Sequence, residues 1–383
     1  MDKSIAVVPL DVHKRFSLAA PLSGAAEVVA EVRLEHGDLE QLVTYLGGLA
    51  PGTPVVLEAT LNWPWLVDLV EAVGLQPHLA DPRQARKLRT GLAKSDRRDA
   101  VWLGRLWLAG DLFPEVYLAP PEVRRMRDRF RQRLLLVQLR TRQKNNVHGQ
   151  LLKLGILADG QVADIFSPKG RRWLAQLPLD AHQRSLLDAK LAVIADLDRH
   201  IAALEQQIRQ ELEHDPRAPI LMSIPGVGQL TAYTLLAEIG DLGRFPNGRA
   251  LAAYAGVLPR DNESADKDFG KRTDRRCNTF LRWAAIEAAT GAVRGSRRLR
   301  SLHARVQQRH KQQPGKARIA VARELLELVH LLLTRGQRYQ EDPPPRPGSD
   351  RRRDRRTPPA SPDPNRASQM RLSARPPARD ARG

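Results

Sequence analysis

Two long helical patterns in the middle of the chain constrain its fold more than any other feature. Residues 122–155 and 182–214 each continue without a proline, and the second carries leucine and isoleucine at intervals of three and four. Such spacing is typical of a coiled-coil seam. A helical hairpin that packs on itself and a dimerisation arm fit it equally well. The seam residues are Leu187, Leu191, Ile194, Leu197, Ile201, Leu204 and Ile208.

The segment before these helices predicts a mixed sheet covered by helices. Three short strands with turn-like breaks are followed by alternating helical and strand patterns. The predicted strands are residues 4–10, 16–22, 27–33, 54–60 and 75–80, and the predicted helices are 38–48, 63–73 and two within 82–110.

The segment after the long helices predicts a compact helical domain over residues 220–336, with a loop-rich centre at 255–278. The composition changes near Glu341, where prolines, serines and arginine runs leave almost nothing to bury. Residues 341–383 therefore predict a disordered, net-basic tail.

The charge balance indicates a polyanionic partner. The chain has 62 lysines and arginines against 43 aspartates and glutamates, a net charge of +19, and its arginines form runs. DNA or RNA suits this excess better than a small acidic substrate, although a merely basic protein is the alternative.

The location predicted from the sequence is the bacterial cytoplasm, in association with the nucleoid. The single cysteine, Cys277, excludes an intrachain disulfide and a cysteine-pair zinc site. The N-terminal apolar run is too short for a signal peptide, and no stretch approaches the roughly 20 apolar residues that cross a membrane.

Four carboxylates suggest a metal site. Asp11 and Glu58 stand near the ends of apolar strands, where acids are depleted. Asp96 and Asp99 are three positions apart on a predicted helix, so both point the same way. RNase H-like nucleases combine strand and helix acids in this way to hold two divalent cations. Mg²⁺ (or Mn²⁺) would relieve the repulsion; neutralisation by the adjacent arginines at 97 and 98 is the structural alternative.

The motifs LDVHKR, LEAT and KSDRRDA occur in this order, followed by SIPGVGQLTAYTLLAEIGDLGRF and LAAYAGVLP. Together they resemble the DEDD transposases, the insertion sequence one-ten class of recombinases with the related Piv DNA invertases. The resemblance extends over about residues 5–340. It implies an α/β plus all-α chain: a RuvC-like (RNase H-like) domain over 1–115, a long coiled-coil helical region over 116–215, a C-terminal transposase domain over 216–340 and the tail over 341–383.

The resemblance also implies a function. It gives Asp11, Glu58, Asp96 and Asp99 the four metal-binding places in a recombinase that mobilises an insertion sequence. DNA, a structured guide RNA and a homo-oligomer (a dimer or tetramer at synapsis) are the implied partners. A RuvC-type nuclease that uses metal-activated water and a non-catalytic transposase remnant that binds nucleic acid are the rival functions.

The polar segment 260–282 resembles the family's serine loop. Ser264 takes the place of a nucleophile that forms a phosphoserine bond with DNA, whereas a serine in a polar loop is otherwise an ordinary surface residue. Two family glycines are replaced, by Ala265 and Cys277, and a position that needs positive φ would be strained there. The expected phosphate-binding residues, whose alternative is a solvated basic face, are Lys271, Arg272, Arg275, Arg276, Asn278 and Arg282.

The IPGVG turn at 224–228 resembles a helix-hairpin-helix turn. Its glycines, Gly226 and Gly228, would let backbone N–H groups approach a DNA phosphate. A tight turn between packed helices is the alternative. Neither Cys277 nor His13 has a sequence context that identifies it as a nucleophile or as part of a site.

Overall fold

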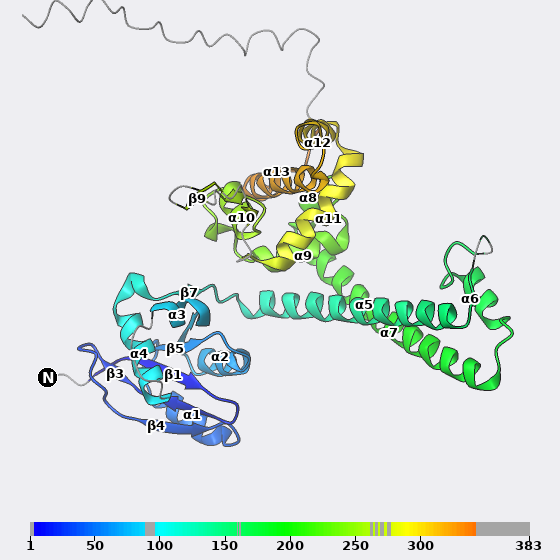
Figure 1. Cartoon of the computed structure of the whole chain (residues 1–383). Coiled ribbons are helices and arrows are strands. Elements are labelled where there is room, and N and C mark those ends of the chain that lie inside the picture. The colour runs from blue at the N-terminus through cyan, green and yellow to red at the C-terminus, as the bar shows by residue number, and fades with distance from the viewer. Residues whose placement is uncertain are drawn as a thin grey trace, which may run out of the picture. The chain divides into compact units, whose positions relative to one another are not determined.

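The N-terminal part of the chain forms a mixed sheet of seven strands, in the order β4-β2-β1-β5-β6-β7 with β3 also paired to β1 (Figure 1). The computed structural model describes residues 4–88, 96–158, 160, 162–260, 263–264, 267–268, 272–273 and 277–341, without the side chains of residues 96, 97, 111, 259–273 and 314. β1 is parallel to β5 and β5 to β6, while the other pairs are antiparallel. The strands are β1 (Ile5–Val12), β2 (Phe16–Ala19), β3 (Leu22–Ser23), β4 (Val32–Glu35), β5 (Pro54–Glu58), β6 (Gln76–Ala80) and β7 (Glu115–Val116). The mixed sheet is confirmed and is consistent with an RNase H-like domain.

The strands between residues 16 and 35 differ from the predicted ones. The predicted strand 16–22 is divided into β2 and β3, and the predicted strand 27–33 is wrong, because β4 begins only at Val32. Ala26 has a φ of 61° and its N–H donates to the Ser23 carbonyl over 2.9 Å, so the chain turns here. The apolar alternation in this stretch runs through the turn and conceals it.

The two faces of the sheet pack against different helices. α1 (Leu39–Gly47) and α2 (Trp63–Ala72) cover one face, where they pack against Val8 and Leu10 of β1. α4 (Asp96–Leu108) covers the other face, where its Leu103 packs against Val7 of β1. Successive strand residues point to opposite faces. Val7, Pro9 and Asp11 of β1 therefore point toward α4. The predicted helices in this region are confirmed. The two predicted within 82–110 are α3 (Pro82–Leu88) and α4.

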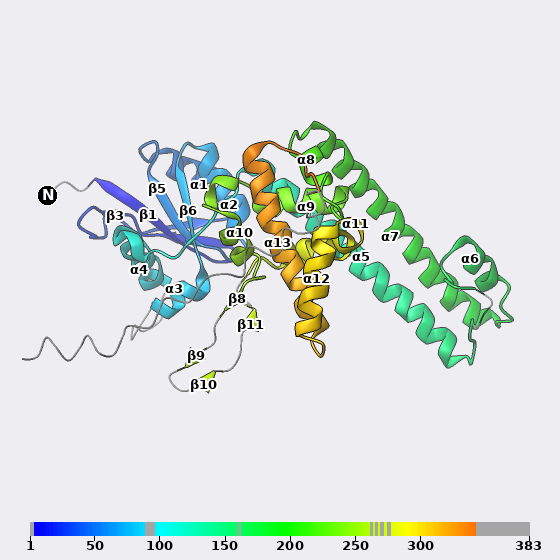
Figure 2. The same ribbon diagram turned by 90° about the horizontal axis from the view of Figure 1, so that it is seen from above.

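The two long helices are confirmed as α5 (Pro121–Lys153) and α7 (Ala181–His214), which lie side by side in Figures 1 and 2. They are antiparallel, because side-chain contacts join residue 129 to 211, 133 to 205 and 140 to 198. Every seventh residue of the α7 seam is buried: Leu187, Ile194, Ile201 and Ile208. The apolar seam of α7 is thus buried within a helical hairpin of a single chain. The short helix α6 (Pro168–Ala175), which the sequence did not predict, packs on the far ends of the pair.

The C-terminal helices share one core with the near ends of α5 and α7, through Phe130, Ile208 and Leu212. All residues of α9 from Ala232 to Ile239 are buried. The helices are α8 (Ala218–Met222), α9 (Gln229–Ile239), α10 (Gly248–Tyr254), α11 (Thr279–Gly295), α12 (Arg297–Arg309) and α13 (Pro314–Arg335). The predicted loop-rich centre contains two-residue strands that pair antiparallel, β8 (Pro259–Arg260) with β11 (Arg272–Thr273) and β9 (Glu263–Ser264) with β10 (Lys267–Asp268).

The predicted tail lies outside the described residues beyond Glu341. Among the helices that the structure does describe, none combines the length and the apolar character needed to cross a membrane.

Candidate functional site

Asp11 and Glu58 stand side by side at the carboxyl ends of two parallel strands. β1 and β5 pair Val8 with Val55 and Leu10 with Leu57, so the next residue on each strand is an acid. Neighbours in a parallel register point to the same face of the sheet. Both side chains are partly exposed. The sheet therefore brings together two carboxylates that are 47 positions apart in sequence, on the face that α4 covers.

The packing of α4 turns its aspartates toward this face. A Cβ built on Gly104 would lie 2.8 Å from Cγ of Pro9 and 2.7 Å from Cδ1 of Leu22, so only glycine allows the helix to approach so closely. Leu103 is 3% exposed against the sheet, and Asp99 lies one turn before it on the same side of the helix. The Oδ1 atom of Asp99 is buried.

Asp96 begins α4, but its side chain lies outside the described residues. Among the side chains that are described, no group of three acids, histidines or cysteines is close enough to hold a metal ion. The structure thus brings together the two strand acids and places the helix acids on the element above them, without completing a four-carboxylate cluster.

His13 contacts the first of the strand acids, although its sequence context did not indicate a site. Its Nε2 lies 3.1 Å from Oδ2 of Asp11, and its ring stacks on Phe16 with centroids 4.5 Å apart. Asn62, which precedes α2, donates its side-chain amide to the His13 carbonyl over 2.8 Å. The ring is therefore held beside the Asp11 carboxylate. The signal in the sequence was the spacing D-x-H at the end of an apolar strand.

Asp81 is a further acid at this edge of the sheet, since it follows Ala80, which pairs with Glu58. Its Oδ1 accepts hydrogen bonds from the backbone N–H groups of Arg83 (2.8 Å) and Gln84 (3.2 Å) at the start of α3. Burial alone would raise the pKa of Asp81, but these hydrogen bonds outweigh burial and lower the pKa. Asp81 therefore serves as a helix cap.

The chemistry of the donor set fits a hard divalent cation. Asp11, Glu58 and Asp99 offer carboxylate oxygens, which Mg²⁺ and Mn²⁺ prefer. None of these three residues contributes a sulfur ligand. Bound there, such an ion would stabilise negative charge on a phosphate.

The predicted serine loop is described only in part. Ser264 lies in β9, where it pairs with Lys267 of β10, and Arg272 lies in β11 opposite Arg260. The side chains of these residues lie outside the described part of the chain. The same holds for the whole of Ala265, Lys271, Arg275 and Arg276.

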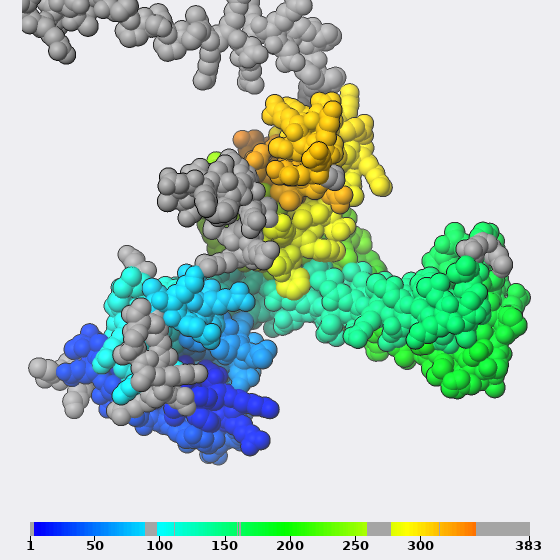
Figure 3. Space-filling model, in the orientation of Figure 1, coloured from blue at the N-terminus to red at the C-terminus, as the bar shows by residue number. Residues whose placement is uncertain are grey.

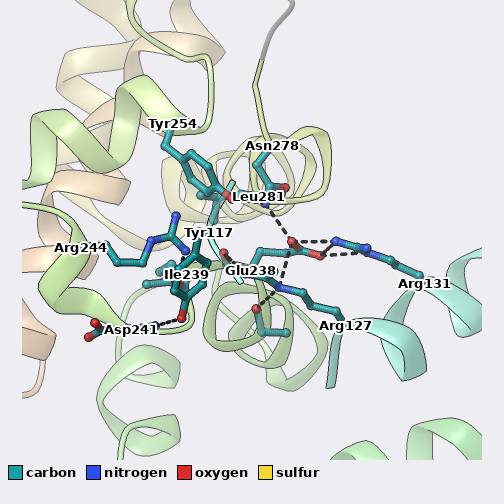
Figure 4. A network of polar contacts seen from close by, with 11 residues as sticks. Tyr117, Arg127, Arg131, Glu238, Ile239, Asp241, Arg244, Tyr254, Asn278 and Leu281 are labelled. Carbon is teal, nitrogen blue, oxygen red and sulfur yellow. Dashed lines mark hydrogen bonds and ion pairs between the residues drawn. The ribbon is translucent and has the colours of Figure 1, made fainter. Parts of the chain in front are cut away.

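Asn278 and Arg282, predicted to bind phosphate, hold the end of this segment to the helical core. The Oδ1 of Asn278 accepts from the N–H of Leu281 over 2.9 Å and so caps α11, while its amide donates to Oε2 of Glu238 over 2.8 Å (Figure 4). Arg282 donates to the carbonyl of Gly256 over 3.2 Å. Both side chains thus have structural partners within the protein.

The two glycines of the IPGVG turn differ in the space around them. Gly226 has a φ of +87°, which favours glycine. A Cβ on it would also lie 2.3 Å from the Ala288 carbonyl oxygen of α11, so the packing against α11 is sufficient to require glycine there. Gly228 stands at the N-cap of α9, and a Cβ on it would have no neighbour within 4 Å. Only Gly228 therefore leaves room for a ligand to approach.

A basic surface on α12 was missed in the sequence. No acidic residue occurs between Glu287 and Glu324. Leu299 is buried against the core, and α12 forms part of the surface in Figure 3. The absence of acids over so long a stretch was the available signal. The exposed arginines of α12 are Arg297, Arg298, Arg300, Arg305 and Arg309.

Two family models match separate parts of this chain. The model described as Transposase IS116/IS110/IS902 family matches residues 218–304, and a DEDD transposase model of the IS110 type matches residues 8–156. Together they cover more than half of the chain.

Curated relatives carry corresponding descriptions. A Pseudomonas aeruginosa protein named "Probable family 20 transposase" is 31% identical over 43% of this chain and 49% of its own length. The "Transposase for insertion sequence element IS1111A" of Coxiella burnetii is 26% identical over 54% of this chain and 57% of its own. The "Transposase for insertion sequence element IS1328" of Yersinia enterocolitica is 23% identical over 65% of this chain and 73% of its own length. The chain thus spans about half the length of the first two relatives.

Proposed function

We propose that this chain, which belongs to the IS116/IS110/IS902 family of transposases, cuts and rejoins DNA strands to move an insertion sequence. The observation that carries the proposal is the register of β1 and β5. It places Asp11 beside Glu58 on the face covered by α4, within the segment matched by the DEDD transposase model.

The acids at this edge form the first half of the proposed active site. Asp11, Glu58, Asp96 and Asp99 would hold Mg²⁺ or Mn²⁺, whose chemistry is to stabilise charge on the scissile phosphate. His13 would orient the Asp11 carboxylate, because it contacts Oδ2 of that residue and is fixed by Phe16. The carboxylates supply hard oxygen ligands at fixed positions, since they lie on strands and a helix rather than on loops.

Ser264 forms the second half of the proposed site. Its Oγ attacks the phosphorus, so a serine–phosphate bond forms while the bond to the leaving deoxyribose oxygen breaks. That oxygen gains a proton as the serine loses one. Attack by another DNA hydroxyl reverses the exchange and frees the serine. The bond energy is conserved, so rejoining needs no external energy source. The family resemblance of the segment around Ser264 supports this role.

The proposed partners are DNA, a structured guide RNA and further copies of the chain, as a dimer or tetramer at synapsis. The net charge of +19 and the basic face of α12 favour a polyanion. The guide RNA is proposed from the family resemblance, and sequencing of nucleic acid that copurifies with the protein tests it.

Denaturing electrophoresis of the protein incubated with labelled DNA tests the reaction. Wild type should give a covalent protein–DNA band that requires Mg²⁺, and Ser264→Ala should give none. Ser264→Thr keeps a hydroxyl and serves as a matched variant for loop structure. A band that persists in Ser264→Ala would move the nucleophile to another residue. Cleavage without any covalent band would favour a RuvC-type nuclease that uses water, for which the replacements Ala265 and Cys277 are an argument. DNA binding without cleavage would favour a non-catalytic remnant.

A further inference from the structure

Glu238 is a carboxylate with no exposed surface, placed in the middle of the C-terminal core (Figure 4). An isolated buried carboxylate is strongly disfavoured, so its partners decide whether it is tolerated. Arg131 of α5 donates to both of its oxygens, over 3.1 and 3.2 Å. The Nε of Arg127, also on α5, lies 3.6 Å from Oε2. The carboxylate is thus neutralised from one side by the same helix.

A further hydrogen-bond partner of the Glu238 carboxylate, Asn278, precedes α11 and is not charged. The amide of Asn278 donates to Oε2 of Glu238 over 2.8 Å and lies 3.2 Å from the Tyr254 hydroxyl. A neutral amide adds little to charge balance, since two arginines already face the carboxylate. What the contact does add is position, because a hydrogen bond to a charged group is short and directional.

Asn278 stands where the segment that carries Ser264 returns to the core. That segment leaves α10 after Tyr254 and ends at the N-cap of α11. The N–H of Asn278 donates to the Tyr254 carbonyl over 2.9 Å, so the two ends are bonded to each other. Arg282 adds a second link, to the carbonyl of Gly256. One side chain, that of Asn278, therefore connects both ends of the segment to the buried Glu238.

Helix α5 is attached at the same point. Arg127 donates to the carbonyls of Ala237 (2.8 Å) and Glu238 (3.2 Å) at the end of α9. Burial lowers the pKa of Arg127, and the nearby charge of Glu238 partly opposes that effect. The carboxylate thus receives hydrogen bonds or charge from α5 and from the N-cap of α11.

We propose that Glu238 is a positioning residue for the serine segment: through Asn278 it sets where that segment leaves and re-enters the core. The inference rests on the proposed function of Ser264. A purely packing role would be served as well by apolar residues in place of both Glu238 and its arginine partners, because replacing a whole buried ion pair by apolar groups is often neutral for stability. Retention of the carboxylate is explained by the shorter and stronger hydrogen bond that a charged acceptor gives to the Asn278 amide.

Three variants separate positioning from packing. Glu238→Gln removes the charge at constant shape. Asn278→Asp keeps the α11 cap, because aspartate is also a good N-cap, but sets a second carboxylate against Glu238. The double variant Glu238→Gln, Asn278→Asp exchanges amide and carboxylate and so restores one hydrogen bond of opposite polarity. Glu211→Gln is a control that makes the same change of residue type at an exposed position. Glu211 pairs with Arg129 of α5 and accepts from the Tyr233 hydroxyl of α9 over 2.6 Å, so its partners lie outside the serine segment.

The first measurement is hydrogen exchange of the free protein, which does not depend on activity. Peptides covering residues 248–258 and 277–285 should exchange faster in each single variant, return toward wild type in the double variant and stay protected in Glu211→Gln. The second measurement is the rate of covalent bond formation at saturating DNA. The single variants should lose about 10- to 100-fold, as expected of a small misplacement, and the double variant should be partly restored. DNA affinity should be unchanged in Glu238→Gln, whose side chain is buried.

The two proposals fail in different ways. If wild type forms no covalent bond but the exchange pattern is as expected, the role of Ser264 is wrong and the anchor stands as a structural one. If the exchange of both peptides in the single variants matches that of Glu211→Gln, Glu238 does not position the segment, whatever the activity. A double variant no better than either single variant would equally overturn the pairing.

Discussion

Gly226 and Gly291 meet backbone to backbone: a Cβ built on Gly291 would lie 2.7 Å from the Cα of Gly226. Gly226 belongs to the IPGVG turn and Gly291 to α11, so this contact sets how closely α11 approaches the turn. The first glycine of the motif is thereby explained by packing. Of the two glycines, only Gly228 at the start of α9 has room for a phosphate to approach its backbone.

The contact predicts that Gly291→Ala destabilises the protein. Alanine in a helix normally gains about 1 kcal/mol over glycine, but overpacking a tight contact costs about 1–3 kcal/mol, and here the neighbour is backbone. Thermal unfolding should therefore show a lower melting temperature. Gly149→Ala in α5 is the control, because a Cβ there has no neighbour within 4 Å, and it should raise the melting temperature slightly. Equal shifts in the two variants would contradict the packing argument.

The carboxylates of β1, β5 and α4 predict a stability response to metal. Each of the variants Asp11→Asn, Glu58→Gln and Asp99→Asn should weaken the rise in melting temperature that Mg²⁺ produces, because ligands are lost. Without Mg²⁺ the same variants should unfold at an equal or higher temperature, because like charges repel. The measurement is differential scanning fluorimetry with and without Mg²⁺, together with strand cleavage, which should be lost.

Asp81→Asn is the matched control for these acids. It removes a carboxylate from the same edge of the sheet, but one that caps α3, and asparagine keeps the cap. Its response to Mg²⁺ and its cleavage rate should remain those of wild type. A loss as large as that of Glu58→Gln would place Asp81 among the ligands.

The lowered pKa of Asp81 predicts a pH effect. A depressed folded pKa contributes stability that is present above the unfolded pKa, about 4, and is lost as the pH falls through the folded value. Between pH 6 and pH 3, Asp81→Asn should therefore lose less stability than wild type. Urea unfolding at several pH values measures the difference, and parallel curves for the two proteins would contradict it.

The basic face of α12 predicts a salt effect. Each phosphate contact contributes about 0.9 to the slope of log affinity against log salt concentration. Replacing Arg297, Arg305 and Arg309 with glutamine should therefore reduce the slope by about 1–3 for DNA of any sequence. The same number of glutamine replacements at Arg142, Arg199 and Arg209, exposed arginines of α5 and α7, serves as the control. Equal slopes for the two triple variants would remove α12 from the DNA interface.

Much of the chain could be predicted from its sequence because the signals are local. The helices α5 and α7 follow from apolar spacing and the absence of proline, and β1, β5 and β6 follow from short apolar runs between turns. Asp11 and Glu58 stood out because acids near the ends of apolar strands are unusual. The turn at Ala26 was missed, since apolar alternation continued through a backbone that bends.

Tertiary structure alone decided which distant residues meet. Nothing local pairs β1 with β5 rather than with another strand, so the adjacency of Asp11 and Glu58 depends on strand order. Glu238 is buried only because α5 and α11 pack against α9 in the fold. The roles of Asn278 and Gly226 likewise depend on their neighbours. The physical reason is that propensity and periodicity act over a few residues, whereas burial, charge pairing and close packing depend on the elements that the fold brings together.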